Sequence, residues 1–176
     1  MYNPSDDSFL LLETLKEYRG ETAMEIGIGS GIISNYLCNR FHVVISTDIN
    51  LSGLKRIKKD IDISNNINLI CCHSCTPIFN TKFDLIVSNP PYLPDDKDFN
   101  DKTIHGGKKG IETLIIFLKD ALPLLKKNGK IVCLISSFSE FNDLYKFTKE
   151  NDLQIRKINE KKLFFEILYV YEISKK

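Results

Sequence analysis

The sequence contains no long apolar run. No uninterrupted apolar stretch reaches the roughly 18 residues that a membrane-spanning helix requires. The first residues, MYNPSDDSF, also lack the basic and apolar regions of a secretory signal peptide. We therefore expect a cytoplasmic protein that does not bind a membrane.

A net charge of one sign is nearly absent as well. The 176 residues include 24 basic and 23 acidic side chains, which leaves a formal charge of +1. A protein that binds nucleic acid through a broad basic surface usually carries a larger positive charge. Only local basic patches remain, at 55–59, at 126–127 and at the C-terminus. Nucleic acid is therefore not the favoured partner.

The cysteine pattern excludes a secreted disulfide framework. There are five cysteines, an odd number, and three of them lie within residues 71–75. Cys72 and Cys75 form a C-x-x-C pair, but no second pair completes a tetrahedral zinc site. We expect core thiols at Cys71 and Cys72 and no bound metal ion.

Five short apolar runs predict the parallel strands of one domain spanning residues 1–176. The length suits a single hydrophobic core, and no repeat, linker or change of composition divides the chain. The runs are nearly continuous in apolarity and often β-branched, which is typical of parallel strands buried on both faces. They occupy residues 22–26, 42–47, 67–72, 83–88 and 130–135.

Between these runs, apolar residues recur at helical spacing. Residues 5–18 predict one helix, and the apolar stripe within 111–125 predicts another that is closed by Gly129. Ser137 and Glu140 have the spacing of a capping box, which predicts the start of a third helix. Strands and helices therefore alternate along most of the chain.

The C-terminal part has a different pattern. The runs 153–158 and 163–173 have no helix between them, so we expect an antiparallel pair, with Phe165 and Ile167 on one face of the second strand. Together the elements predict an α/β fold: a Rossmann-like, doubly wound sheet, mostly parallel, with an antiparallel C-terminal strand pair. Such sheets bind ligands at the carboxyl ends of the strands, where the strand order reverses.

A glycine-rich turn directly follows the first strand. In MEIGIGSGI, Gly27, Gly29 and Gly31 come after Glu25, and glycines let the backbone approach a ligand closely at a helix N-terminus. A dinucleotide fingerprint requires glycine at position 32, which is Ile32 here. The Glu25 carboxylate would repel a pyrophosphate and suits a ligand that carries an ammonium group.

Asp48 ends the second strand, in STDIN, at a place where a carboxylate binds both hydroxyls of a ribose. A ligand with an amino-acid end, a ribose and no phosphate is S-adenosylmethionine. The alternative is a structural glycine turn, with Asp48 capping the next helix. These residues alone leave both interpretations open.

The fourth strand ends in a rigid corner. DLIVSNPPYLPDD runs from an apolar strand into Asn89, Pro90, Pro91 and Tyr92, and proline fixes φ and removes a backbone donor. The prolines lock the backbone, so the Asn89 side-chain carbonyl and a main-chain carbonyl become two fixed acceptors for a planar NH₂ group. Tyr92 offers a flat face for stacking on that group. The alternative is a Pro-Pro segment that only breaks the strand.

Two fixed acceptors favour one kind of chemistry. A nitrogen whose lone pair is delocalised into a carbonyl or a ring attacks a methyl group more readily when both N–H bonds are held and aligned. Side-chain amides and exocyclic base amines are such nitrogens. We therefore predict methyl transfer to one of these two groups in a closed, dry pocket.

The motifs EIGIGSG, TDIN and FDLIVSNPPYLP resemble the class I S-adenosylmethionine-dependent methyltransferases of the amino-nitrogen group. More narrowly, YNPSDDSFLLLETL and GGKKGIE (106–112) resemble segments of the short HemK-like enzymes. The resemblance covers most of residues 2–135 and is thin beyond them. It implies a glutamine N5-methyltransferase of the archaeal and eukaryotic type, acting on the Gly-Gly-Gln loop of a translation release factor.

The resemblance also implies roles for individual residues. Asn89, Pro90, Pro91 and Tyr92 would hold the substrate amide at the catalytic corner. A small zinc-binding activator protein is implied as the partner in a heterodimer. The residues implied to contact S-adenosylmethionine are Ser8, Glu25, Gly27, Gly29, Gly31, Asp48, Ile49, Ser74 and Asn89.

One position departs from the family pattern. The family has an acid after the third strand that contacts the adenine amino group, whereas this chain has CCHSCTP, with His73 and Ser74 at that place. Ser74 or a backbone carbonyl would have to replace the acid.

Two other functions remain open from the sequence. A nucleic-acid methyltransferase for the exocyclic amine of adenine or guanine shares the acceptor geometry, but usually carries a recognition domain or a basic groove. An inactive S-adenosylmethionine-binding scaffold subunit is the second, and the intact Asn-Pro-Pro-Tyr motif argues against it. The acidic loop favours a basic protein segment over a phosphate backbone; it contains Asp95, Asp96, Asp98 and Asp101.

Overall fold

In the computed structural model, which describes residues 4–60, 66–99 and 101–176, seven strands form one sheet in the order β3-β2-β1-β4-β5-β7-β6. The strands are β1 (Gly20–Ile26), β2 (Phe41–Asp48), β3 (Ile67–Cys71), β4 (Phe83–Ser88), β5 (Leu125–Ser136), β6 (Leu153–Lys162) and β7 (Ile167–Lys175). Neighbours among β1 to β5 pair parallel, and β7 pairs antiparallel with β5 and β6. The predicted fold class is confirmed.

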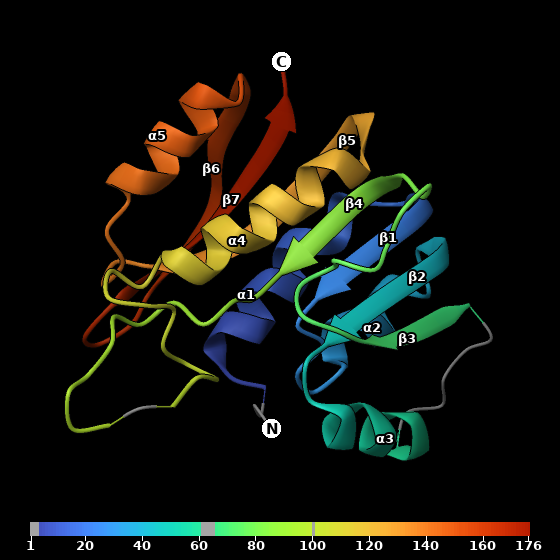
Figure 1. Cartoon of the computed structure of the whole chain (residues 1–176), viewed down its shortest axis with the longest axis horizontal. Coiled ribbons are helices and arrows are strands. Elements are labelled where there is room, and N and C mark those ends of the chain that lie inside the picture. Colours follow the sequence, from blue (N-terminus) through green and yellow to red (C-terminus); the bar gives the residue numbers. More distant parts are fainter. Residues whose placement is uncertain (1–3, 61–65, 100) are drawn as a thin grey trace.

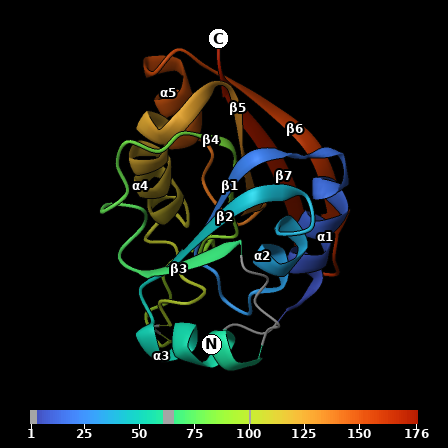
Figure 2. The same ribbon diagram turned by 90° about the vertical axis from the view of Figure 1, so that its right-hand side faces the viewer.

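Helices cover both faces of this sheet (Figures 1 and 2). They are α1 (Asp6–Thr14), α2 (Ile32–Leu37), α3 (Leu51–Asp60), α4 (Glu112–Ala121) and α5 (Asn142–Glu150). Helices α4 and α5 lie on one face, and α1 and α2 lie on the other. None of the helices within the described ranges is long and apolar enough to cross a membrane.

The alternation of side chains along β1 gives each face its own core. Met24 and Ile26 pack with the buried residues of α4 and α5, whereas Ala23 packs with those of α1 and α2. Each fully buried aliphatic side chain contributes about 1.5–3 kcal/mol to stability. The same alternation turns Glu25, an acid, toward the α1 and α2 face, where its carboxylate accepts a hydrogen bond from Ser34 of α2.

The end of α4 differs from the prediction. The helix ends at Ala121, a short 3₁₀ turn at Leu122–Leu124 follows, and β5 begins at Leu125. Pro123 stops the helix because it has no backbone N–H to donate. Gly129 therefore lies inside β5 rather than closing a helix, and a Cβ there would press against the carbonyl of Phe83.

Two other predicted boundaries are wrong. The Ser137–Glu140 capping box does not form, because α5 begins only at Asn142 and the Ser137 hydroxyl accepts a hydrogen bond from the N–H of Ile167 at 3.0 Å. The last strand begins at Ile167, so Phe165 lies in the β6–β7 turn and is 80% exposed. Only the part of the predicted alternation from Ile167 onward belongs to the strand.

The strand order reverses between β1 and β4. The chain passes from β1 outward to β2 and β3, and then returns to β4 and β5 on the other side. Ile26 and Ser88, the last residues of β1 and β4, are paired in the register. The glycine turn and the corner at Asn89 therefore leave the sheet side by side, at the place where doubly wound folds bind ligands.

Candidate functional site

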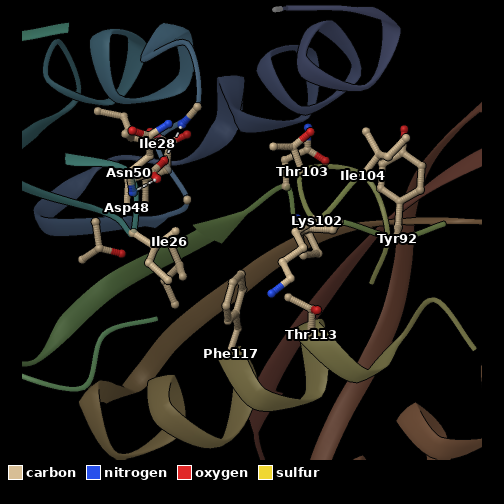
Figure 3. Close-up of a pocket in the computed structure, with 18 of the residues that line it drawn as sticks. Ile26, Ile28, Asp48, Asn50, Tyr92, Lys102, Thr103, Ile104, Thr113 and Phe117 are labelled. Carbon is tan, nitrogen blue, oxygen red and sulfur yellow. Dashed lines mark hydrogen bonds between the residues drawn. The ribbon is translucent and has the colours of Figure 1, made fainter. Parts of the chain in front are cut away.

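A cleft of about 680 Å³ opens at the carboxyl ends of β1, β2 and β4. Figure 3 shows Asp48 and Asn50 at one end, Tyr92 at the other, and Phe117 of α4 along the side between them. Gly31 is the one predicted site residue outside the lining; its φ of 82° places it at the N-cap of α2. The predicted residues that line the cleft are Ser8, Glu25, Gly27, Gly29, Asp48, Ile49, Ser74, Asn89, Pro90, Pro91 and Tyr92.

Asp48 holds the glycine turn against the end of β2. Its Oδ2 accepts the N–H of Gly29 at 3.2 Å, and its Oδ1 accepts the N–H of Asn50 at 2.8 Å. The following helix is capped by Asn50, whose Oδ1 accepts the N–H of Gly53 at 3.0 Å. Asp48 is therefore not the cap of α3, and its carboxylate forms part of the cleft wall.

Space and an unpaired hydroxyl lie along the glycine turn. Gly27 has φ +82°, and a Cβ built there meets no atom within 4 Å. Thr47 also lines the cleft, and its buried Oγ1 has no hydrogen-bond partner within the described parts of the chain. An unpaired buried polar group costs about 1–3 kcal/mol. The turn therefore fits a polar ligand that lies close to the backbone.

Glu25 is a buried acid in the wall of this cleft. Burial raises the pKa of its carboxyl group to about 8, and the negative charge of Asp48 adds to the rise, although hydrogen bonds from Ser34 oppose it. The group is therefore mostly neutral at pH 7 in the free protein. A cationic ligand group nearby would favour the carboxylate and lower this pKa.

The corner is held by main-chain hydrogen bonds from the loop that follows it. The N–H groups of Tyr92 and Leu93 donate to the carbonyl of Ile104 at 3.1 and 2.9 Å. The N–H of Gly106 donates to the carbonyl of Leu93 at 2.9 Å, and the Ser139 hydroxyl donates to the carbonyl of Tyr92 at 2.8 Å. The corner backbone is thus fixed from both the loop and the segment after β5.

Two glycines of the GGKKG segment fit closely against the corner. A Cβ on Gly106 would overlap the carbonyl oxygen of Pro91, and one on Gly110 would overlap that of Tyr92. Gly110 also has φ +70°, which disfavours other residues. The segment that resembles the family's Gly-rich stretch is therefore shaped around the corner as well as leading into α4.

Asn89 is fixed through its amide nitrogen. Its Nδ2 donates to Oδ2 of Asp7 at 3.0 Å, and the Tyr92 hydroxyl donates to the same oxygen at 3.3 Å. The other end of the Asn89 amide, Oδ1, is buried and has no partner in the described structure. The predicted acceptor is therefore present, and it lacks a donor.

Asp7 lines the cleft and contacts the corner, and the sequence motifs did not single it out. It is 1% exposed and lies on the buried side of α1, three and four residues before the buried Leu10 and Leu11. An acid at helical spacing from two core leucines was the available signal, because buried carboxylates are rare unless they are paired.

Among the described residues, none that lines the third-strand end of the cleft is an acid. Cys72, His73 and Ser74 line it, and the buried Ser74 hydroxyl makes only a long contact of 3.8 Å to the sulfur of Cys75. Cys71 is exposed and Cys72 half-buried, so the expectation of core thiols there is wrong. In the described ranges, no three metal-ligating side chains gather at one place.

Comparisons with known proteins identify the family. The family model of the Eco57I restriction-modification methylases matches residues 15–166. A Methanocaldococcus jannaschii protein, named for an inferred protein N5-glutamine methyltransferase activity, is 34% identical over 148 residues, which cover 79% of this chain and 74% of that protein. The chain belongs to the HemK-like class I methyltransferases.

Two further matches place this HemK-like chain. The release factor glutamine methyltransferase of Aquifex aeolicus is 31% identical over 134 residues, which cover 68% of this chain but only 48% of that enzyme. The solved E. cuniculi Mtq2–Trm112 complex, described as responsible for methylation of the eRF1 translation termination factor, matches with a TM-score of 0.80 at 24% identity. That match covers 99% of this chain and 98% of the solved one, and it shows the shared class I fold.

Proposed function

We propose that the protein transfers a methyl group from S-adenosylmethionine to the side-chain amide nitrogen of a glutamine in a translation release factor. The observation that most supports this proposal is that Oδ1 of Asn89 is a buried acceptor without a partner in the described structure, while Nδ2 of the same amide already donates to Asp7. A glutamine NH₂ group supplies the missing donor. The names of the M. jannaschii and A. aeolicus relatives support glutamine as the acceptor, and the E. cuniculi complex supports a termination factor.

The residues around the glycine turn fit S-adenosylmethionine. When bound, S-adenosylmethionine supplies an electrophilic methyl group on a positively charged sulfur. Asp48 would accept the ribose hydroxyls and Glu25 would balance the ammonium group, whereas Gly27 and Gly29 would admit the ligand close to the backbone; all four residues line the cleft. The remaining residues assigned to the cofactor are Ser8, Gly31, Ile49, Ser74 and Asn89, with Gly31 acting by shaping the turn.

The corner residues act on the acceptor nitrogen. Asn89 Oδ1 and a main-chain carbonyl of the corner accept its two N–H bonds and draw the lone pair out of conjugation with the amide carbonyl. Tyr92 stacks on the amide plane, while Pro90 and Pro91 keep the acceptors from moving. The nitrogen would gain the methyl group as the bond between that methyl group and the sulfonium sulfur breaks, with the bonding electron pair left on the sulfur. The nitrogen would then lose a proton to water, because an N-protonated amide is strongly acidic. No side-chain base is required before transfer.

A nucleic-acid base is the second candidate acceptor. The match to the Eco57I family model favours it, because that family is named for restriction-modification methylases. The formal charge of +1 and the acidic side chains of the exposed loop at 95–98 weigh against a polyanionic substrate. Since translation termination takes place in the cytoplasm, the leading proposal also places the enzyme there.

A small zinc-binding activator protein is proposed as a partner in a heterodimer. The E. cuniculi structure is described as a complex of Mtq2 with a second protein, Trm112, which supports a partner chain. Among the strands that the structure describes, β3 is an outermost one, so its outer side offers strand hydrogen-bonding positions to a partner. Copurification followed by zinc analysis of the complex tests the partnership.

One experiment separates the candidate functions. Purified protein, with and without the activator, is incubated with isotopically labelled S-adenosylmethionine and either a release factor or DNA and RNA. We expect label on the release factor, and its loss in Asn89→Ala, while Asn39→Ala, an exposed asparagine outside the cleft, serves as the matched control. Label on nucleic acid alone would contradict glutamine methylation, and cofactor binding without any transfer would favour a scaffold subunit.

A further inference from the structure

We propose that Asp7 is a positioning residue that determines which end of the Asn89 amide faces the methyl acceptor. The inference rests on the proposed amide methylation, since it concerns how the acceptor is held. Its basis is the pairing of a buried carboxylate with one end of an amide whose other end has no partner in the described structure.

One oxygen of the Asp7 carboxylate is used within α1. Oδ1 accepts hydrogen bonds from the Ser5 hydroxyl at 2.8 Å and from the Ser8 hydroxyl at 3.2 Å, and also from the N–H of Ser8. Ser5 is the N-cap of α1 and Ser8 lies in its first turn, where a negative charge is favoured by the helix dipole. They fix the plane and the rotamer of the carboxylate.

The other oxygen faces the corner. Oδ2 accepts from Asn89 Nδ2 at 3.0 Å and from the Tyr92 hydroxyl at 3.3 Å. An ionised carboxylate is an acceptor only, whereas an amide has a donor end and an acceptor end. Asp7 therefore selects the donor end of Asn89, and Oδ1 is left for the substrate. Turning the amide over would set two oxygens against each other and present an NH₂ group to the substrate's own NH₂ group.

This role differs from a purely structural contact between α1 and the end of β4. A structural contact would tolerate any two side chains that hold the two elements together. A selector of amide orientation requires one acceptor-only group and one donor, so exchanging the two side chains should preserve the arrangement while either single change destroys it. In the exchanged pair, the carboxylate at position 89 still presents an oxygen toward the cleft.

The test uses Asp7→Asn, Asn89→Asp and the double variant carrying both changes. Asp7→Asn permits the Asn89 amide to turn over, and Asn89→Asp sets two carboxylates side by side. We expect each single change to lower kcat by about 100-fold, because a misplaced catalytic contact costs about that much. The double variant should recover about tenfold or more of the lost rate. Asp6→Asn, the same change at an exposed neighbour paired with Lys161, should keep wild-type kcat.

A second readout does not depend on activity. The side-chain NH₂ protons of Asn89, identified as the NMR signal absent from Asn89→Ala, should be shifted downfield and protected from exchange in the wild type. Asp7→Asn should abolish that shift, while calorimetric affinity for S-adenosylmethionine stays at the wild-type value. Asp6→Asn should leave the signal unchanged.

The outcomes are distinct. An unchanged Asn89 signal and an unchanged kcat in Asp7→Asn would overturn the proposal, as would a double variant no faster than the slower single variant. If the wild type methylates a nucleic-acid base and no glutamine, the proposed substrate is wrong, and the NMR signal still decides whether Asp7 orients Asn89.

Discussion

Binding of S-adenosylmethionine should expel a proton from the buried carboxyl group of Glu25. Burial raises the pKa of this group to about 8 in the free protein. At pH 7 about 0.9 of the molecules then carry the proton, by the ordinary titration relation. The ammonium group of the cofactor favours the carboxylate and brings its pKa below 7. We therefore expect up to about 0.9 proton released per cofactor bound at pH 7, with the full number reached when the pKa in the complex lies well below 7.

Calorimetry measures this number directly. The observed binding enthalpy is determined at pH 7 in several buffers of different ionisation enthalpy, and the slope of one against the other gives the protons released. Glu25→Gln, which has no proton to lose, should give a slope near zero. A slope near zero in the wild type, with binding intact, would refute the assignment of Glu25 to the ammonium end.

The same carboxyl group makes the stability of the free protein depend on pH. Its folded pKa of about 8 exceeds the ordinary value of 4.5, so the folded state binds the proton more tightly than the unfolded state. The contribution of Glu25 to the free energy of unfolding is therefore largest below pH 4.5 and falls as the pH rises toward 8. The fall is about 1.4 kcal/mol per pH unit and of the order of 5 kcal/mol at most. Glu25→Gln should flatten this dependence in urea unfolding measured between pH 5 and 8.

Three other substitutions test separate parts of the structure. Gly27→Ala places a methyl group in the ligand space at φ +82° and should weaken calorimetric binding of S-adenosylmethionine by about tenfold or more; unchanged affinity would contradict a ligand at the turn. In Gly110→Ala the added methyl group overlaps the carbonyl of Tyr92, so the free energy of unfolding should fall by about 1–3 kcal/mol and kcat should fall as well. A stable, fully active variant would show that the corner backbone shifts to admit the methyl group. The Asp84 carboxylate accepts hydrogen bonds from two N–H groups of β1 and from Lys126, the last at 2.8 Å. Partial burial would raise the pKa of this group, but the hydrogen bonds outweigh it and hold the pKa below its usual value. Asp84→Asn should therefore lower the free energy of unfolding by about 1 kcal/mol at pH 7, and by less as the pH falls through that pKa. Equal destabilisation at all pH values would contradict the charge-assisted bonds.

Strand β4 was predictable because it is buried on both faces. Residues 83–88 are apolar at four of six positions, and the structure has β4 over the same residues. Ends were less predictable where tertiary contacts decide them. Gly129 follows a helical pattern, where glycine is typical of a helix C-terminus. It lies in β5 instead, beside the carbonyl of Phe83, where only a residue without a Cβ fits.

The lining of the cleft was predictable where its residues belong to one short segment. Gly27 and Asn89 each belong to such a segment, and both line the cleft. Asp7 has no such motif: its partner Asn89 is 82 residues away, and the pair exists only because α1 docks beside the end of β4. Gly31 belongs to the glycine motif but acts at the N-cap of α2, outside the cleft lining.

The most direct test of amide methylation at the corner is the identity of the methylated atom. Release factor treated with the enzyme and S-adenosylmethionine is digested and sequenced by tandem mass spectrometry, with Asn89→Ala as the paired sample. We predict one added methyl group on the glutamine side chain of the Gly-Gly-Gln loop, absent in the Asn89→Ala sample although that variant still binds the cofactor. Methylation of a nucleic-acid base alone, or undiminished glutamine methylation by Asn89→Ala, would contradict the role of the corner.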